Sequence, residues 1–237
     1  MSEVATTRAW PPVSAVKWDD THRLIPASYA DTDAPFVEEL TENPGDVALL
    51  IDLMSATNAR LKAQADALPA GIRRDELVFA VPHWRIVNAA FCYPHPAGSR
   101  FSGPDRGAWY AARFIRTSLR EVAFHKQIEL AETDWWELTI DYQDYTADIH
   151  SDLHDLRHAR DTNAKACLSP TSYRQSQDVA GELLEEESLG IVYPSVRDEG
   201  RGALACFRPA SVANVRTGSS YRLKWTGKKP PTTKRLP

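Results

Sequence analysis

Five residues of this chain could together carry out chemistry on a charged ligand. Arg85 lies within WRIV, Glu121 ends the run WYAARFIRTSLRE, Ser195 lies within GIVYPSVR, and Arg100 and Tyr110 lie between the first two. An arginine can bind phosphate through two parallel hydrogen bonds, and an aromatic ring can stack on a flat cation. A carboxylate can stabilise positive charge that develops at a sugar carbon. If these side chains meet in space, they suit an anionic ligand with one reactive cationic centre.

These sequence frames resemble the RES domain family, which is named for its Arg, Glu and Ser. The resemblance covers about residues 81–210 and also includes the SRF run at 99–101. Characterised members of the family are NAD-consuming toxins of bacterial toxin–antitoxin pairs. The resemblance therefore implies a fold similar to that of the ADP-ribosyltransferases of the diphtheria-toxin type.

The resemblance also implies a role for each residue. Arg85 and Arg100 would hold the pyrophosphate of NAD, and Tyr110 would stack on nicotinamide or its ribose. Glu121 would be the catalytic carboxylate, and Ser195 would form a hydrogen bond near the reacting ribose. NAD would be the substrate, with no further cofactor. Two departures from the family pattern, GSRF for a GGRW-like run and SLRE for ALAE, indicate a different pocket rim.

Three functions are compatible with this resemblance. The first is cleavage of the nicotinamide–ribosyl bond of NAD by a glycohydrolase or a phosphorylase, which would deplete NAD and arrest growth. The second is a protein ADP-ribosyltransferase that uses NAD. The third is a catalytically degenerate module that binds a nucleotide or an antitoxin. An Xre-type helix-turn-helix antitoxin is the implied protein partner, and a homo-oligomer is left open.

Each candidate residue type also has an ordinary structural interpretation. An arginine in a strand can be a surface cation, and a glutamate on an amphipathic helix is usually solvated. A tyrosine in a strand usually belongs to the core, and a serine beside a turn can cap its own hairpin. Arg197 and Tyr173 are secondary candidates near the same motifs.

A metal site is the main rival hypothesis. His150, His154 and His158 follow one another at four-residue spacing, which would place them on one face of a helix and could chelate zinc. The HExxH pattern is missing, and the neighbouring residues are polar. A solvated helix face is the preferred interpretation, and we expect no metal.

Composition restricts the class of protein. The chain has 237 residues, of which 43% are hydrophobic, and a formal net charge of −4. This charge argues against a generic surface for nucleic acid or anionic membranes, because such surfaces need clustered cations. No apolar run approaches the roughly 20 residues of a membrane helix. Three well-separated cysteines and the lack of a signal peptide favour a soluble protein of the reducing cytoplasm.

The order of the elements predicts an α+β fold, a twisted mixed sheet with flanking helices. We expect strands at 76–82, 84–87, 109–112 and 135–145, and a hairpin of strands at 190–196 and 203–207. Helices are expected at 46–68, from an N-cap at Thr117 through Ile128, at 148–160 and at 176–187.

Three regions follow from this assignment. Residues 1–80 are expected to form an N-terminal extension with one helix, packed on or beside the core, whose first 35 residues or so are loosely ordered. Residues 81–215 would form the catalytic domain. Residues 216–237 would form a basic, proline-containing C-terminal tail that is frayed over its last twelve residues.

Overall fold

The computed structural model describes residues 11–30, 71–158 and 160–237. The helix expected at 46–68 lies outside these residues. The strands are β1 (Val13–Pro26), β2 (Trp109–Ala112), β3 (Glu137–Asp155), β4 (Gly190–Pro194), β5 (Gly202–Cys206), β6 (Ala213–Thr226) and β7 (Thr232–Arg235). The helices are α4 (Trp84–Cys92), α5 (Ile115–Thr133), α6 (Thr162–Cys167) and α7 (Arg174–Glu185). In the described part of the chain, short 3-10 turns lie at Ala27–Tyr29, Arg74–Glu76 and Pro209–Ser211.

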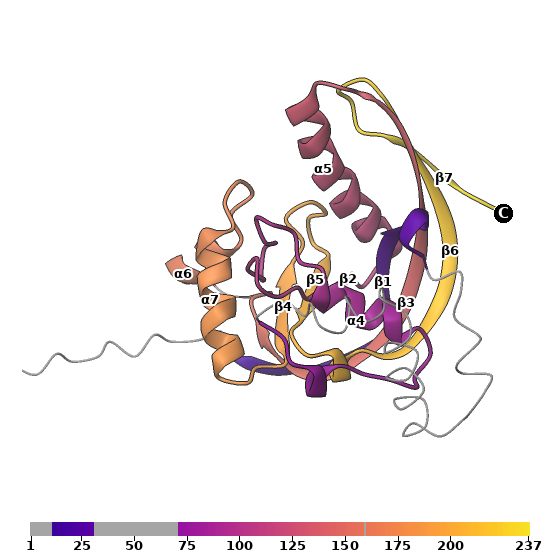
Figure 1. Cartoon of the computed structure of the whole chain (residues 1–237). Coiled ribbons are helices and arrows are strands. Elements are labelled where there is room, and N and C mark those ends of the chain that lie inside the picture. The colour runs from indigo at the N-terminus through magenta and orange to yellow at the C-terminus, as the bar shows by residue number, and fades with distance from the viewer. Residues whose placement is uncertain (1–10, 31–70, 159) are drawn as a thin grey trace, which may run out of the picture.

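The strands form one seven-stranded sheet in the order β1-β2-β5-β4-β3-β6-β7. The pairing of β3 with β4 is parallel, and the other pairings described are antiparallel. Since β1 pairs with both β2 and β3, the sheet curls back on itself at one end. The long strands β3 and β6 curve along the whole height of the molecule (Figure 1). The expected α+β fold with a twisted mixed sheet is confirmed.

Alternating side chains of the short strands divide the core into two faces. On β4 and β5, Val192, Leu204 and Cys206 pack with α4 on one face. The other face of β4 and β5 packs with α6 and α7 and carries Ile191, Tyr193, Ala203 and Ala205. A third cluster lies under α5, where the upper parts of β3 and β6 carry Tyr142, Leu223 and Trp225. In Figure 1, α5 lies along this upper part and α7 beside β4.

Three predicted elements have the wrong type. Residues 84–87 belong to the helix α4, not to a strand, because Ile86, Val87, Ala90 and Phe91 are buried at helical spacing. Residues 76–82 form a 3-10 turn and loop instead of a strand. Residues 148–155 continue β3 and are not a helix. The buried residues Ala147, Ile149, Leu153 and Asp155 are separated by even numbers of positions, as on one face of a strand, and β3 is 19 residues long.

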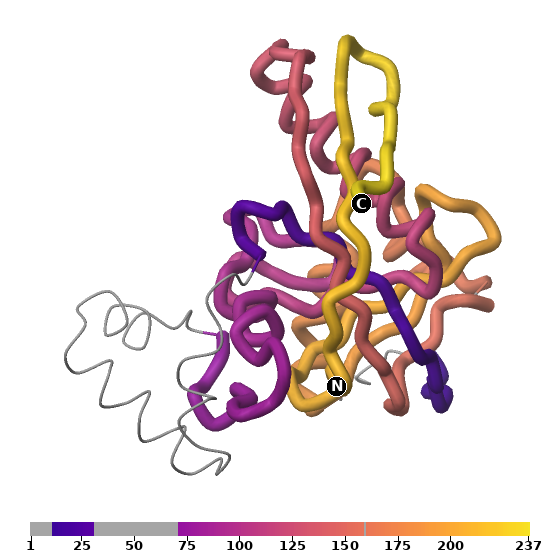
Figure 2. Tube along the Cα trace, turned by 90° about the vertical axis from the view of Figure 1, so that its right-hand side faces the viewer, coloured from indigo at the N-terminus to yellow at the C-terminus, as the bar shows by residue number. Residues whose placement is uncertain are grey.

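Both ends of the described chain are more ordered than the sequence predicts. Instead of loose chain, β1 pairs with β3 along nearly its whole length, from Val13 opposite His154 to Pro26 opposite Tyr142. The last twelve residues, which are predicted to be frayed, include all of β7, and most of β6 lies within the expected tail at residues 216–237. The hairpin of β6 and β7 extends beside β3 and α5 (Figure 2). The backbone hydrogen bonds of a neighbouring strand hold these polar segments in place.

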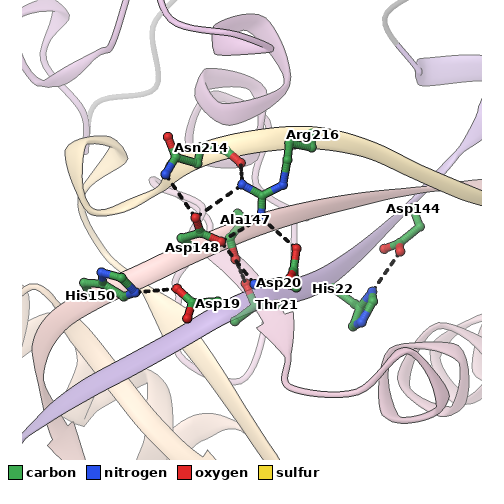
Figure 3. A network of polar contacts seen from close by, with 10 residues as sticks. All are labelled: Asp19, Asp20, Thr21, His22, Asp144, Ala147, Asp148, His150, Asn214 and Arg216. Atoms are coloured by element: carbon green, nitrogen blue, oxygen red, sulfur yellow. Dashed lines mark hydrogen bonds and ion pairs between the residues drawn. The ribbon is translucent and has the colours of Figure 1, made fainter.

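A polar network joins β1, β3 and β6 (Figure 3). The Asp148 carboxylate accepts hydrogen bonds from the Asp20 backbone N–H at 3.1 Å, from Asn214 at 3.0 Å and from Arg216 at 2.7 Å. Arg216 also pairs with the Asp20 carboxylate at 2.7 Å. Asp20 lies at a bulge of β1 and has a positive φ of 51°. The network therefore fixes an irregular part of β1 on the sheet.

The three histidines do not form the expected helix face, because His150 and His154 belong to the strand β3. His150 binds Asp19 at 2.7 Å, His154 binds the carbonyl of Pro11 at 2.9 Å, and His158 lies beyond the end of β3. Within the described ranges, no group of three or more His, Cys, Asp and Glu residues could hold a metal ion. In the same part of the chain, none of the helices has both the length and the apolar character to cross a bilayer.

Candidate active site

A glutamate and a serine separated by 74 residues form the centre of the site. The Ser195 hydroxyl donates a hydrogen bond of 2.7 Å to Oε1 of Glu121. The same hydroxyl oxygen accepts the backbone N–H groups of Arg197 at 3.2 Å and Asp198 at 3.1 Å. Because both acceptor positions of the hydroxyl are used, its single proton is directed to the carboxylate.

Short-range features of the chain place these two residues. Ser195 follows β4 directly, and its N–H donates to the carbonyl of Arg201 at 2.7 Å, which closes the turn between β4 and β5. Gly200 has a positive φ of 73° in this turn, a conformation that favours glycine. Glu121 lies in the second turn of α5, which begins at Ile115 and not at Thr117. The expected hairpin is confirmed, and it brings Ser195 against α5.

The surroundings of Glu121 have opposing effects on its pKa. Burial is the largest influence and raises the pKa of Glu121 above the usual value of a glutamate. The hydrogen bond from Ser195 and the positive charges of Arg100 and Arg197 lower this pKa and offset part of the shift. The net result is a partly buried carboxylate that remains close to two cations.

Arg100 lies on the chain between α4 and β2 and is 7% exposed. Its Nη1 donates to the carbonyls of Cys167 at 3.1 Å and Ser169 at 2.8 Å. Its guanidinium lies 4.6 Å from the ring centroid of Tyr173, so the secondary candidate Tyr173 contacts the predicted site. These contacts fix the guanidinium in position and keep its charge near Glu121.

Tyr110 is on β2 and faces the side of the sheet that α7 covers. Its hydroxyl accepts the N–H of Phe101 at 2.9 Å and lies 3.1 Å from the Ser102 hydroxyl. Burial raises the pKa of Tyr110 to about 12, so the phenol is neutral at physiological pH. Tyr110 therefore anchors the SRF segment that carries Arg100.

Arg197, the other secondary candidate, lies beside the Ser195–Glu121 pair. Its guanidinium lies 3.3 Å from the ring centroid of Phe124 on α5, and its Nη2 donates to the carbonyl of Pro170 at 2.6 Å. Nε of Arg197 is buried without a hydrogen-bond partner. Arg197 thus links the turn after β4 to α5 and to the loop before α7.

Arg85 has a different setting. It lies on α4, and its guanidinium is 5.3 Å from the ring centroid of Trp84. The buried residues of α4 pack on the face of the sheet occupied by Trp109 and Ala111, opposite the face that Tyr110 enters. Glu121, Ser195, Arg100 and Tyr110 are thus grouped by their contacts, whereas Arg85 lies on a helix that packs on the other face of the sheet.

Sequence reasoning missed two residues of this region. Tyr193 is buried within the GIVYPSVR motif, and its ring centroid is 4.8 Å from that of Phe101. Burial, followed by the charge of Glu121, raises the pKa of Tyr193 well above its usual value. Asp198 is 1% exposed and contacts α5. Asp198 directly follows the GIVYPSVR motif, and this position is the sequence signal that could have indicated it.

A cavity of about 600 Å³ lies elsewhere, lined among others by Asp148, His150, Asn214 and Arg208. Of these residues, Asp148 and Asn214 belong to the polar network of β1, β3 and β6, whereas Arg208 pairs with Glu76. None of the five predicted site residues lines it.

Comparison with known proteins identifies the family. The family model described as the RES domain matches residues 77–226. The chain belongs to the RES domain family. All five predicted residues fall within this RES domain, which extends past the expected boundary at residue 215 and includes β6.

No curated protein matches the sequence of this RES domain protein. A similar solved structure is the crystal structure of the M. tuberculosis MbcT-MbcA toxin-antitoxin complex, with 13% identity over 87% of this chain and 85% of that chain, and a TM-score of 0.44.

Proposed function

We propose that this RES domain cleaves the bond between nicotinamide and ribose in NAD. The observation that supports the proposal is the Ser195–Glu121 hydrogen bond, in a partly buried setting beside the charges of Arg100 and Arg197. A carboxylate held in this way can stabilise positive charge, and the neighbouring cations suit a ligand that carries a pyrophosphate. Membership of the RES domain family supports the same assignment.

The reaction balances with NAD and one acceptor. The bond between ribose C1′ and the nicotinamide nitrogen breaks, and its electron pair neutralises the positive nicotinamide ring. Ionised Glu121 stabilises the oxocarbenium-like charge left on the ribose, while Ser195 keeps the carboxylate in position. An oxygen of the acceptor then bonds to C1′, and its proton passes to solvent. Arg100 supplies positive charge for the pyrophosphate. Arg85 is proposed as a second residue that binds it, although α4 packs on the other face of the sheet.

The acceptor distinguishes the forms of this proposal. Water gives a glycohydrolase, and phosphate gives a phosphorylase; these are the leading forms. A protein side chain gives an ADP-ribosyltransferase, which is the alternative form of the enzyme. A catalytically degenerate module that binds a nucleotide or an antitoxin is the alternative from another class, and it predicts no turnover.

The proposed cellular role is growth arrest by depletion of NAD in the cytoplasm. A cognate antitoxin of the Xre type, with a helix-turn-helix domain, is the proposed protein partner, and a homo-oligomer is also proposed. Expression of the chain alone should arrest a bacterial host, and Glu121→Ala should relieve the arrest. Equal growth of cells that express similar amounts of wild type and variant would contradict the toxin assignment.

The direct test is incubation of the purified chain with NAD, with and without inorganic phosphate. Nicotinamide release and the other product are followed by chromatography and mass spectrometry. Release that requires phosphate, with a phosphorylated ADP-ribose as product, identifies a phosphorylase, and release without phosphate identifies a glycohydrolase. Folded protein free of antitoxin that releases no nicotinamide contradicts both. ADP-ribosylation of an added protein would instead support the transferase.

A further inference from the structure

The side chain of Asp198 is the most heavily hydrogen-bonded carboxylate near the Ser195–Glu121 pair. It is 1% exposed and accepts hydrogen bonds from Thr117 Oγ1 at 2.7 Å, Arg116 Nη2 at 2.9 Å and Arg120 Nη1 at 2.6 Å. All three donors lie in the first two turns of α5. Burial alone would raise the pKa of Asp198, but the hydrogen bond from Thr117 and the arginines keep it below its usual value. Asp198 is therefore ionised at neutral pH.

Asp198 and Ser195 attach one turn to one helix at two points. The Asp198 carboxylate binds the start of α5, and the Ser195 hydroxyl binds Glu121 on the same helix. Between the two points, the N–H of Asp198 donates to Ser195 Oγ at 3.1 Å, and the carbonyl of Asp198 accepts the N–H of Arg201 at 3.1 Å. A shift of Asp198 relative to α5 would therefore move both the Ser195 oxygen and the proton that it directs to Glu121.

Without Asp198, Arg116 and Arg120 could form hydrogen bonds with water, because their side chains are 57% and 51% exposed. Thr117 could not, because it is completely buried. A buried hydroxyl needs a partner, and a buried carboxylate without its donors is costly. Water therefore cannot replace the hydrogen bond between Thr117 and Asp198.

We infer that Asp198 is a positioning residue for the proposed NAD cleavage, which acts through Ser195 to hold the Glu121 carboxylate in its reactive orientation. This inference rests on the proposed function for its kinetic consequence. Its geometric content, that Asp198 and Thr117 control the Ser195–Glu121 hydrogen bond, is independent of the reaction. Small displacements of a reacting group can lower turnover by about 100-fold.

The kinetic test is a double-mutant cycle of Asp198→Asn and Ser195→Ala on kcat for nicotinamide release. In the wild-type background, Asp198→Asn is expected to lower kcat by about 10- to 100-fold with little change in KM. In the Ser195→Ala background, the same change should lower kcat less than about 2-fold, because the Ser195–Glu121 hydrogen bond through which Asp198 acts is already absent. Glu199→Gln is the matched control, an acid-to-amide change at an exposed neighbour, and should leave kcat unchanged. An equal loss from Asp198→Asn in both backgrounds would show a purely structural role and overturn the inference.

A second measurement needs no activity and follows the pKa of Glu121 by carbon NMR of its carboxyl group. The charges that face Glu121 are those of Arg100, Arg197 and Asp198, so Thr117→Val is used because it changes none of them. Loss of the Ser195 hydrogen bond should raise the pKa of Glu121.

The expected result is an upward shift in Thr117→Val and in Ser195→Ala, no further shift in the double variant, and a wild-type value in Thr117→Ser. An unchanged pKa in a folded Thr117→Val variant would overturn the inference. Failure of the wild type to release nicotinamide would instead count against the proposed function alone, and the NMR result would still decide the role of Asp198.

Discussion

Replacement of Glu121 by glutamine tests the central chemical assignment. Glutamine has nearly the same shape, and its amide oxygen can still accept the Ser195 hydrogen bond that is 2.7 Å in the wild type. The variant therefore removes the negative charge and keeps the geometry. We expect NAD binding to stay close to wild type and kcat to fall by about 100-fold or more.

The magnitude follows from the partial burial of Glu121. Two unit charges about 4 Å apart interact by roughly 4 kcal/mol at an effective dielectric constant of about 20. If about two thirds of a unit charge has developed on the ribose in the transition state, the carboxylate contributes about 2.7 kcal/mol, which corresponds to a factor of about 100 in rate. The raised pKa of Glu121 reflects the burial that makes the lower dielectric appropriate.

The assay measures kcat and KM from initial rates of nicotinamide release, and the Kd of NAD by calorimetry on the slow variant. Thermal unfolding of both proteins controls for loss of fold. Turnover of Glu121→Gln equal to that of wild type would refute the catalytic assignment. A large rise in Kd with unchanged kcat would mean that Glu121 contributes to binding and not to the chemical step.

Four further outcomes are expected. Ser195→Ala should move the acidic limb of the pH–rate profile upward, because it removes a hydrogen bond that lowers the pKa of Glu121; an unmoved limb would separate Ser195 from that carboxylate. Glu121→Gln should raise the Tm at neutral pH and lose this advantage at acidic pH, since a folded-state pKa above the unfolded value means that stability falls as the carboxylate ionises. Arg85→Ala should raise the KM for NAD with kcat nearly unchanged, and an unaltered KM would remove Arg85 from the binding site. Arg216→Ala should lower the free energy of unfolding by about 1 kcal/mol at neutral pH, because the Arg216–Asp148 pair is partly exposed. The loss should be smaller at acidic pH, where Asp148 becomes protonated, and urea unfolding at neutral and at acidic pH measures it.

The local frames in the sequence were sufficient to predict the family and several elements. The WYAA strand, the helix that carries Glu121, the helix near 176–187 and the hairpin around Ser195 are all present. Each has a strong local signal, either regular spacing of apolar residues or a turn with glycine between two apolar runs. Where two periodicities compete, local patterns are less reliable. The polar stretch after Tyr145 has buried residues only at alternate positions, and its pairing with β1 and β6 decides that it is a strand.

The motifs containing Arg85, Glu121 and Ser195 are contiguous strings, so the amino-acid sequence shows which residue types are available for chemistry. Which of these residues contact one another is a property of the folded chain. The Ser195–Glu121 hydrogen bond spans 74 positions and depends on the turn after β4 lying against α5. Asp198 has no local pattern of its own, and its role follows from three donors on that helix. Such contacts are set by long-range packing of the sheet and its helices, which no short window of sequence encodes.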